Sequence, residues 1–99
     1  MTRLLVLYHQ PADTVAFDRY YFQTHIPIAK KNPRAEVLHG ELSCVAGGPA
    51  PHVVAELDFD NADQLQNAMG SPEGQATQAD LGNFAQAGVT ILAFDLRSA

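Results

Sequence analysis

Residues 17–27, FDRYYFQTHIP, carry four aromatic rings and a histidine on about two turns of predicted helix, followed by a proline. Phe17, Tyr21 and Thr24 are spaced i, i+4, i+7, so they share one helix face. Pro27 has no backbone N–H to donate, and it disfavours helical dihedrals in the residue before it. We therefore expect the helix to end or kink close to His25. The imidazole then lies at the negative end of a helix dipole, beside carbonyls without helical partners.

His25 is the first candidate for chemistry, because an imidazole titrates near neutral pH and can both accept and donate a proton. The alternative is structural. Aromatic residues at helical spacing commonly pack in a core, and a histidine near a helix C-terminus can cap its carbonyls. Under that alternative, replacing His25 costs about 1–3 kcal/mol of stability through unpaired polar groups and has no specific effect on ligands.

The composition predicts a single domain, residues 1–99, that binds neither nucleic acid nor membrane. Net charge is −5 and the basic residues are scattered except at residues 30–34, so there is no phosphate-binding stripe. The apolar run at residues 4–7 is too short for a signal sequence or a membrane span. Cys44 is the only cysteine, which excludes an internal disulfide and fits a reducing cytoplasm. We expect a cytoplasmic protein.

Periodicity and turn residues divide the chain into four strands and two helical regions. Strands are expected at residues 3–10, 35–45, 52–58 and 89–96, with a hairpin loop at 46–51. Helices are expected at residues 14–24, with a further turn at 28–31, and at 61–70 and 71–88. Asp13, Asn61 and Ser71 are the expected N-caps.

This order predicts an α+β fold, the ferredoxin-like βαββαβ sandwich with a four-stranded antiparallel sheet and helices on one face. The other sheet face carries apolar residues and needs a cover. Only 17% of the residues are charged, which also suggests that a partner chain covers apolar surface. A second copy of the chain would give a two-fold homodimer with its sheets packed together.

Several kinds of chemistry lack the motif that they need. No metal-ligand spacing connects the four histidines, which are His9, His25, His39 and His52. Gly47 and Gly48 belong to a hairpin loop, and no dinucleotide-binding fingerprint is present. Ser43 and Cys44 lie in a predicted strand without a nucleophile-elbow motif. We therefore expect no metal and no cofactor, and acid–base chemistry by histidine remains.

Asp80 is the expected partner of His25, because it is a carboxylate in a largely apolar helix turn. If both helical regions cover the same sheet face, Asp80 can approach His25. The alternative is that Asp80 faces solvent or caps a local kink before Gly82. Tyr8, at a strand end, lines the same cavity or is an ordinary half-buried tyrosine. The predicted catalytic residues are His25, Asp80 and Tyr21.

The predicted substrate-binding residues are aromatic side chains expected near His25, namely Tyr8, Phe17, Tyr21 and Phe84. For Phe84 the competing interpretation is a place in the core. Such a lining fits a small aromatic or oxygenated apolar molecule. It fits an enzyme and a binding protein equally well.

Residues 17–29 read FDxYYxxTHxPIA, a pattern that resembles the signature of the EthD family, named for a protein linked to ethyl tert-butyl ether degradation. The resemblance continues in residues 71–75, SPEGQ, with Asp80 and residues 83–84 and 88–89. It covers nearly the whole chain. It implies a dimeric α+β barrel: a homodimer whose sheets form a barrel, with a pocket between sheet and helices that His25 faces.

Relatives in the wider superfamily include cofactor-free monooxygenases, lactone isomerases and polyketide dehydratases or cyclases, and some distant relatives bind haem. The resemblance thus favours a cofactor-free enzyme. His25 would be the general acid/base, abstracting a proton next to a carbonyl or helping water leave, and Tyr21 or Asp80 would orient it. A monooxygenase is the second enzymatic reading, because an electron-rich phenolate can itself activate oxygen. The non-enzymatic reading is a binding or accessory protein of a degradation pathway.

Overall fold

The computed structural model describes residues 1–31, 36–41 and 50–97. Its strands are β1 (Thr2–Tyr8), β2 (Glu36–Glu41), β3 (Val53–Phe59) and β4 (Val89–Asp95). Its helices are α1 (Thr14–Tyr20), the π-helical segment η1 (Tyr21–His25), α2 (Ile26–Ala29), α3 (Ala62–Gly70) and α4 (Pro72–Phe84). The C-terminal part of the strand expected at residues 35–45, and most of the expected hairpin loop, lie outside the described residues.

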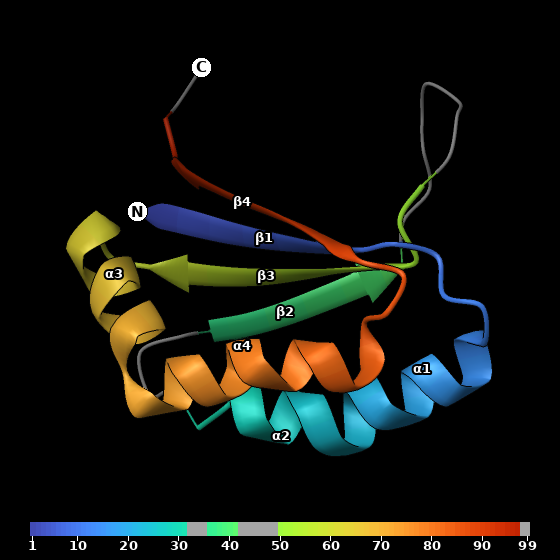
Figure 1. Ribbon diagram of the computed structural model, residues 1–99. Helices are drawn as coiled ribbons and strands as arrows, with labels where there is room; N and C mark the ends of the chain where they lie inside the picture. Colours follow the sequence, from blue (N-terminus) through green and yellow to red (C-terminus); the bar gives the residue numbers. More distant parts are fainter. Residues whose placement is uncertain (32–35, 42–49, 98–99) are drawn as a thin grey trace.

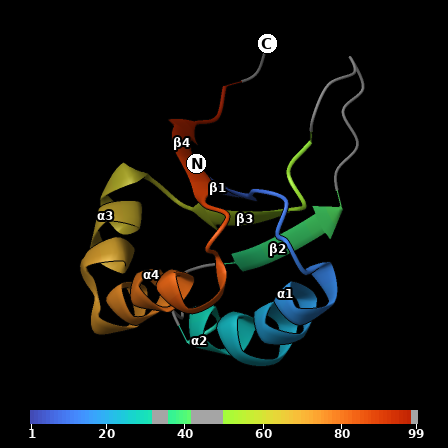
Figure 2. The same cartoon turned by 45° about the vertical axis from the view of Figure 1, so that its right-hand side comes forward.

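The strands form one antiparallel sheet in the order β2-β3-β1-β4. Figures 1 and 2 place α1, α2 and α4 on the same face of this sheet, and no described element covers the opposite face. The ferredoxin-like α+β fold with an antiparallel sheet is confirmed. Within β1 the residues toward the helices, from Thr2 to Tyr8 in steps of two, are buried.

Helical structure does not end at His25, so the predicted end is wrong, but the regular α-helix is interrupted by η1, which finishes at His25. The chain continues from α1 through η1 into α2, and the Ile26 N–H donates to the Tyr21 carbonyl five residues back. Pro27 stands in the first turn of α2, where its missing N–H costs least. The wider π turn just before it absorbs the break, so His25 faces the protein interior rather than free carbonyls.

The three expected helix N-caps are present in the structure. The Asp13 and Asn61 side chains accept the N–H groups of the third residue on, at 3.0 and 2.9 Å, and the Ser71 hydroxyl accepts the Gly74 N–H at 3.0 Å. Helix α4 ends at Phe84, four residues before the expected stop at Gly88. Gly88 instead turns the chain into β4 with a φ of 99°, a conformation that favours glycine.

The core lies between the sheet and the helices, and aromatic rings form its centre. The Tyr8 ring lies 5.5 Å from Phe17, 5.2 Å from Tyr21 and 5.7 Å from Phe84, centroid to centroid. Leu4, Val6, Ile26, Val53, Ala55, Phe59, Leu65 and Ala68 complete the buried cluster. None of the described helices is long and apolar enough to cross a bilayer.

Candidate active site

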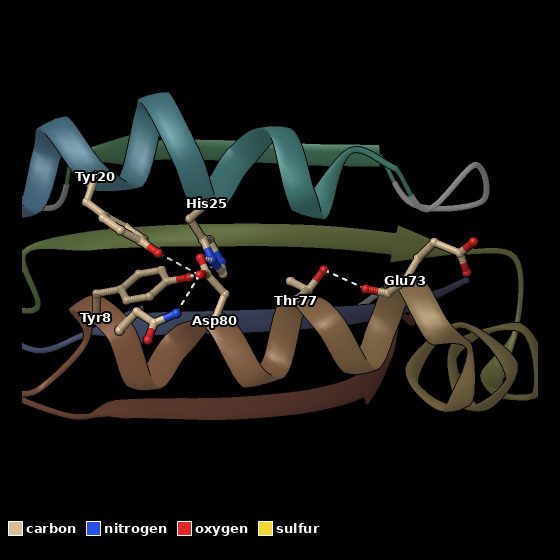
Figure 3. A network of polar contacts seen from close by, with 7 residues as sticks. Tyr8, Tyr20, His25, Glu73, Thr77 and Asp80 are labelled. Carbon is tan, nitrogen blue, oxygen red and sulfur yellow. Dashed lines mark hydrogen bonds and ion pairs between the residues drawn. The ribbon is translucent and has the colours of Figure 1, made fainter.

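Three elements bring polar side chains together beneath the sheet. His25, at the end of η1, has its Nδ1 2.9 Å from Oδ2 of Asp80 on α4 and its Nε2 3.3 Å from the Tyr8 hydroxyl on β1. His25 is 3% exposed, Asp80 7% and Tyr8 2%. Figure 3 shows the His25 ring beside the Asp80 carboxylate, with the Tyr8 ring next to them. Three polar groups thus meet in an otherwise apolar interior.

Asp80 receives three hydrogen bonds. The Tyr20 hydroxyl donates to Oδ1 at 2.7 Å, the Asn83 amide donates to the same oxygen at 3.0 Å, and His25 lies against Oδ2. Burial raises the pKa of Asp80, but the bonds from Tyr20, Asn83 and His25 outweigh it and hold the pKa below its ordinary value. Asp80 is therefore ionised at neutral pH. The alternative that Asp80 faces solvent or caps a kink is wrong.

The partners of His25 fix where its proton lies. Burial lowers the pKa of His25 and Asp80 raises it by less, so the ring is neutral at neutral pH. An ionised carboxylate only accepts, so the single ring proton belongs on Nδ1. Burial also raises the pKa of Tyr8 far above its ordinary value, so its hydroxyl stays protonated and donates to Nε2. The lone pair of Nε2 therefore points away from Asp80.

Tyr21 contacts His25 through its ring. The two rings are stacked, 5.9 Å apart with an interplanar angle of 23°, and Phe84 lies 4.6 Å from His25 on a tilted plane. Burial raises the pKa of Tyr21 to about 12, so it too is neutral. Of the two residues expected to orient His25, Asp80 is the one that holds a ring nitrogen, while Tyr21 packs against the ring.

A cavity of about 60 Å³ lies between the sheet and the helices and is lined by His25, Tyr8 and Tyr21. Its other walls come from β1, β3, β4 and the helices, and include Ile26, Leu57, Met69, Thr77, Gln78, Leu81 and Ile91. Phe17 and Phe84 do not line this cavity. They pack against the aromatic core on its other side and line a separate groove with Tyr20 and Asn83. Helical spacing predicts which side chains lie on the same face of a helix. It does not predict which of them border a cavity and which pack in the core.

Sequence reasoning did not assign a role to Tyr20, Asn83, Met69, Thr77 or Gln78. Asn83 stands three residues after Asp80, a spacing at which helical side chains meet, so its hydrogen bond to Asp80 could have been predicted. The approach of Tyr20 depends on how α1 crosses α4, and no sequence pattern gives that. Among the described residues no three His, Cys, Asp or Glu side chains form a group that could hold a metal ion.

We expect the free energy of unfolding to fall as the pH is lowered from about 7.5 to about 5. His25 has a lower pKa in the folded chain than in the unfolded chain, so the unfolded chain binds more protons below about pH 6.5. This contribution is complete above that pH and is lost as the pH falls toward the folded pKa. Urea denaturation across this range should show a smaller loss in the His25→Gln variant. Equal losses in the two proteins would contradict a buried, neutral His25.

Comparison with known proteins identifies the fold class of this chain and its family. The arrangement of sheet and helices is that of a ferredoxin-like α+β protein, and a family model described as the EthD domain matches residues 9–88. An uncharacterised 11.0 kDa protein from the thcB-thcC intergenic region of Rhodococcus erythropolis is 36% identical over 97 residues, 96% of this chain and 94% of that protein. The chain belongs to the EthD family.

Solved structures share the fold of this chain. An EthD family protein from Bacillus halodurans superposes with a TM-score of 0.89 at 31% identity, over 98% of this chain and 99% of that chain. The hydroxynitrile lyase of Passiflora edulis shares the fold, with a TM-score of 0.76 at 12% identity over 99% and 94% of the two chains. A dimeric ferredoxin-like protein from Bacteroides fragilis does so with a TM-score of 0.66 at 14% identity over 96% and 95%.

Proposed function

We propose that this protein is a cofactor-free enzyme, of lyase or isomerase type, that moves a proton on a small oxygenated apolar molecule. One observation carries the proposal: hydrogen bonds join Asp80, which lies behind the cavity wall, to His25 and then to Tyr8, and His25 and Tyr8 both line the cavity. A neutral imidazole whose far nitrogen is held by a carboxylate is suited to act as a general base and then as a general acid. In this proposal Asp80 orients His25, and Tyr21 packs against it.

The proposed reaction begins when a ligand oxygen takes the place of Nε2 as the partner of the Tyr8 hydroxyl. The bond from Tyr8 to Nε2 is long, at 3.3 Å, so little is lost in breaking it. Nε2 then takes a proton from the carbon next to a carbonyl, and the Tyr8 O–H donates to the oxygen that gains negative charge. Asp80 stabilises the imidazolium that forms. In an isomerase, return of the proton to another atom of the ligand completes the cycle. In a lyase, the electron pair left on carbon expels a neighbouring group, and the imidazolium gives its proton to that leaving group.

The cavity walls favour a ligand that is apolar except at one end. The Thr77 hydroxyl donates to the Glu73 carbonyl, and the Gln78 amide nitrogen donates to the carbonyls of Met69 and Gly74. Because these bonds lie within the α3–α4 segment, the other polar side chains of the wall are those of His25, Tyr8 and Tyr21. We therefore propose a substrate with a single carbonyl or hydroxyl group placed against His25.

The size of the cavity also bears on the substrate. It measures about 60 Å³, whereas a closed protein cavity that binds benzene measures about 150 Å³. An aromatic substrate therefore has to widen the cavity, and Met69 is the wall residue best able to move because its side chain is unbranched and only partly buried. At its present size the cavity favours a ligand smaller than benzene.

The hydroxynitrile lyase supports the proposal by analogy only, since a shared fold does not carry a shared reaction. It is an example of a lyase built on this arrangement of sheet and helices.

We also propose that the protein is a cytoplasmic homodimer. Leu5 pairs with Leu92, and Arg3 with Phe94, on the sheet face opposite the helices. Leu92 is 50% exposed and Phe94 42%, which is unusual for large apolar residues of a strand. A second copy packed on this face would cover both, and the Bacteroides fragilis protein with this fold is dimeric.

Sedimentation of the wild type should give a dimer, and sedimentation of the Leu92→Glu variant should give a monomer. A wild-type protein that sediments as a monomer would exclude the proposed homodimer.

Proton abstraction next to a carbonyl can be measured as exchange of that proton for deuterium. We would incubate the protein in D₂O with butanone, γ-butyrolactone and acetophenone and follow the exchange by ¹H NMR. The wild type should accelerate exchange of at least one compound, and His25→Gln should be about 10²–10⁴-fold slower. His9→Gln is the matched control, because His9 is exposed and does not line the cavity.

The enzyme proposal fails if His25→Gln exchanges the compound as fast as the wild type does. Compounds that bind the wild type and depend on His25, but never exchange, would favour the alternative of a non-catalytic binding protein. Binding is measured separately by thermal shift, since a ligand at a hundred times its dissociation constant adds about 2.7 kcal/mol of stability.

A further inference from the structure

The Asp80 carboxylate is held from two helices, and its two oxygens have different partners. Oδ1 accepts the Tyr20 hydroxyl from α1 and the Asn83 amide from α4, while Oδ2 has His25 as its partner among the described residues. Tyr20 and Asn83 do not line the cavity that His25 borders; they lie toward the separate groove on the other side. In Figure 3 the Tyr20 hydroxyl points at Asp80.

This division of partners has two physical consequences. Two donors on Oδ1 prevent the carboxylate from rotating, so Oδ2 stays in place for His25. They also favour the charged carboxylate, because the Asn83 amide nitrogen can only donate and would face a proton if Oδ1 carried one. An ionised Oδ2 at 2.9 Å then keeps the imidazole proton on Nδ1.

We propose that Tyr20 and Asn83 are positioning residues, which act through Asp80 to hold His25 in the form with its proton on Nδ1 and its Nε2 lone pair toward Tyr8 and the cavity. The catalytic meaning of this inference rests on the proposed function. Its structural content, which is the tautomer of His25, can be tested without any substrate.

The titratable groups that face His25 come from three elements: Tyr8 from β1, Tyr21 from η1 and Asp80 from α4. Both tyrosines stay neutral in the range where histidine titrates. Changes in the tautomer or titration of His25 on removing the Tyr20 or Asn83 side-chain groups therefore report on Asp80.

The experiment is ¹⁵N–¹H correlation NMR of the histidine side chains in the full chain, recorded as a function of pH. Tyr20→Phe removes only a hydroxyl and keeps the ring that stacks on Phe84, and Asn83→Ala changes an exposed position, so both variants are expected to fold. Each should shift the His25 tautomer ratio toward Nε2–H by roughly fivefold, with a larger shift in the double variant. Gln75→Leu, a change of an exposed residue on the same helix, is the control.

A double variant whose His25 keeps the wild-type tautomer and titration would overturn the inference. If the tautomer shifts while no compound undergoes exchange on the wild type, the positioning role stands and the proposed reaction fails. If exchange is found, the double variant should lower kcat and leave the affinity for the compound unchanged. A change in affinity alone would mean that the two residues shape the cavity rather than the base.

Discussion

The Asp80→Asn variant is expected to exchange protons about 10²–10⁴-fold more slowly than the wild type. The asparagine oxygen can still accept from Tyr20, but its amide nitrogen is a donor facing Nδ1 of His25. Two donors cannot face each other, so the ring proton moves to Nε2. The lone pair then points away from the cavity, and the base is lost although the side chain has almost the same shape.

The measurement is the deuterium exchange described above, with ligand binding by thermal shift as a parallel readout. Binding should be retained in Asp80→Asn, because Asp80 does not line the cavity. His9→Gln should match the wild type in both assays. An Asp80→Asn rate close to that of the wild type would mean that Asp80 serves the fold and leaves the reactivity of His25 unchanged.

Gly74→Ala is expected to destabilise the protein by about 3 kcal/mol, the upper end of the usual cost of overpacking. A Cβ at this position would lie 1.9 Å from the Ala68 carbonyl oxygen, which belongs to the backbone of α3 and has little room to move. Gly74 is buried in the first turn of α4, where its N–H is held by Ser71. The elbow between α3 and α4, which forms one wall of the cavity, would have to open.

Gly82→Ala on the same helix is the matched control. Apart from its chain neighbours and the backbone of its own helix, no described atom lies within 4 Å of the position of its Cβ, so helix propensity dominates and the variant should gain about 0.5–1 kcal/mol. Urea denaturation measures both changes. A Gly74→Ala variant that is no less stable than the wild type would show that the α3–α4 elbow is not tightly packed.

Much of the fold follows from local rules. The caps at Asn61 and Ser71 and the proline at the start of α4 each have a direct counterpart in the structure. The path of the chain at His25 does not follow from local rules. The rule that a proline disfavours helical dihedrals in the preceding residue considers one helix without its tertiary contacts. A π turn accommodates the missing N–H of Pro27, and packing against β1 and α4 keeps the helical path continuous. Tertiary contacts, which the local sequence does not show, favour this continuous path over a helix end.

The candidate site is predictable to a similar degree. A carboxylate in an apolar helix turn is costly unless it has partners, and this argument led to Asp80 before its neighbours were known. Tyr20 as a partner could not be predicted, since the aromatic stretch offers several rings and the crossing of α1 over α4 selects one. Phe17 and Phe84 were expected at the cavity, but packing places them in the aromatic core behind Tyr8 and His25.

The protonation of His25 in the wild-type protein can be read by ¹⁵N–¹H NMR of its ring nitrogens during a pH titration. We expect a neutral ring at about pH 7.5 with its proton on Nδ1, and a pKa below its ordinary value of 6.5. That result would show a base already turned toward the cavity. A ring that carries two protons at this pH, or one whose proton lies on Nε2, would contradict the proposed role of His25.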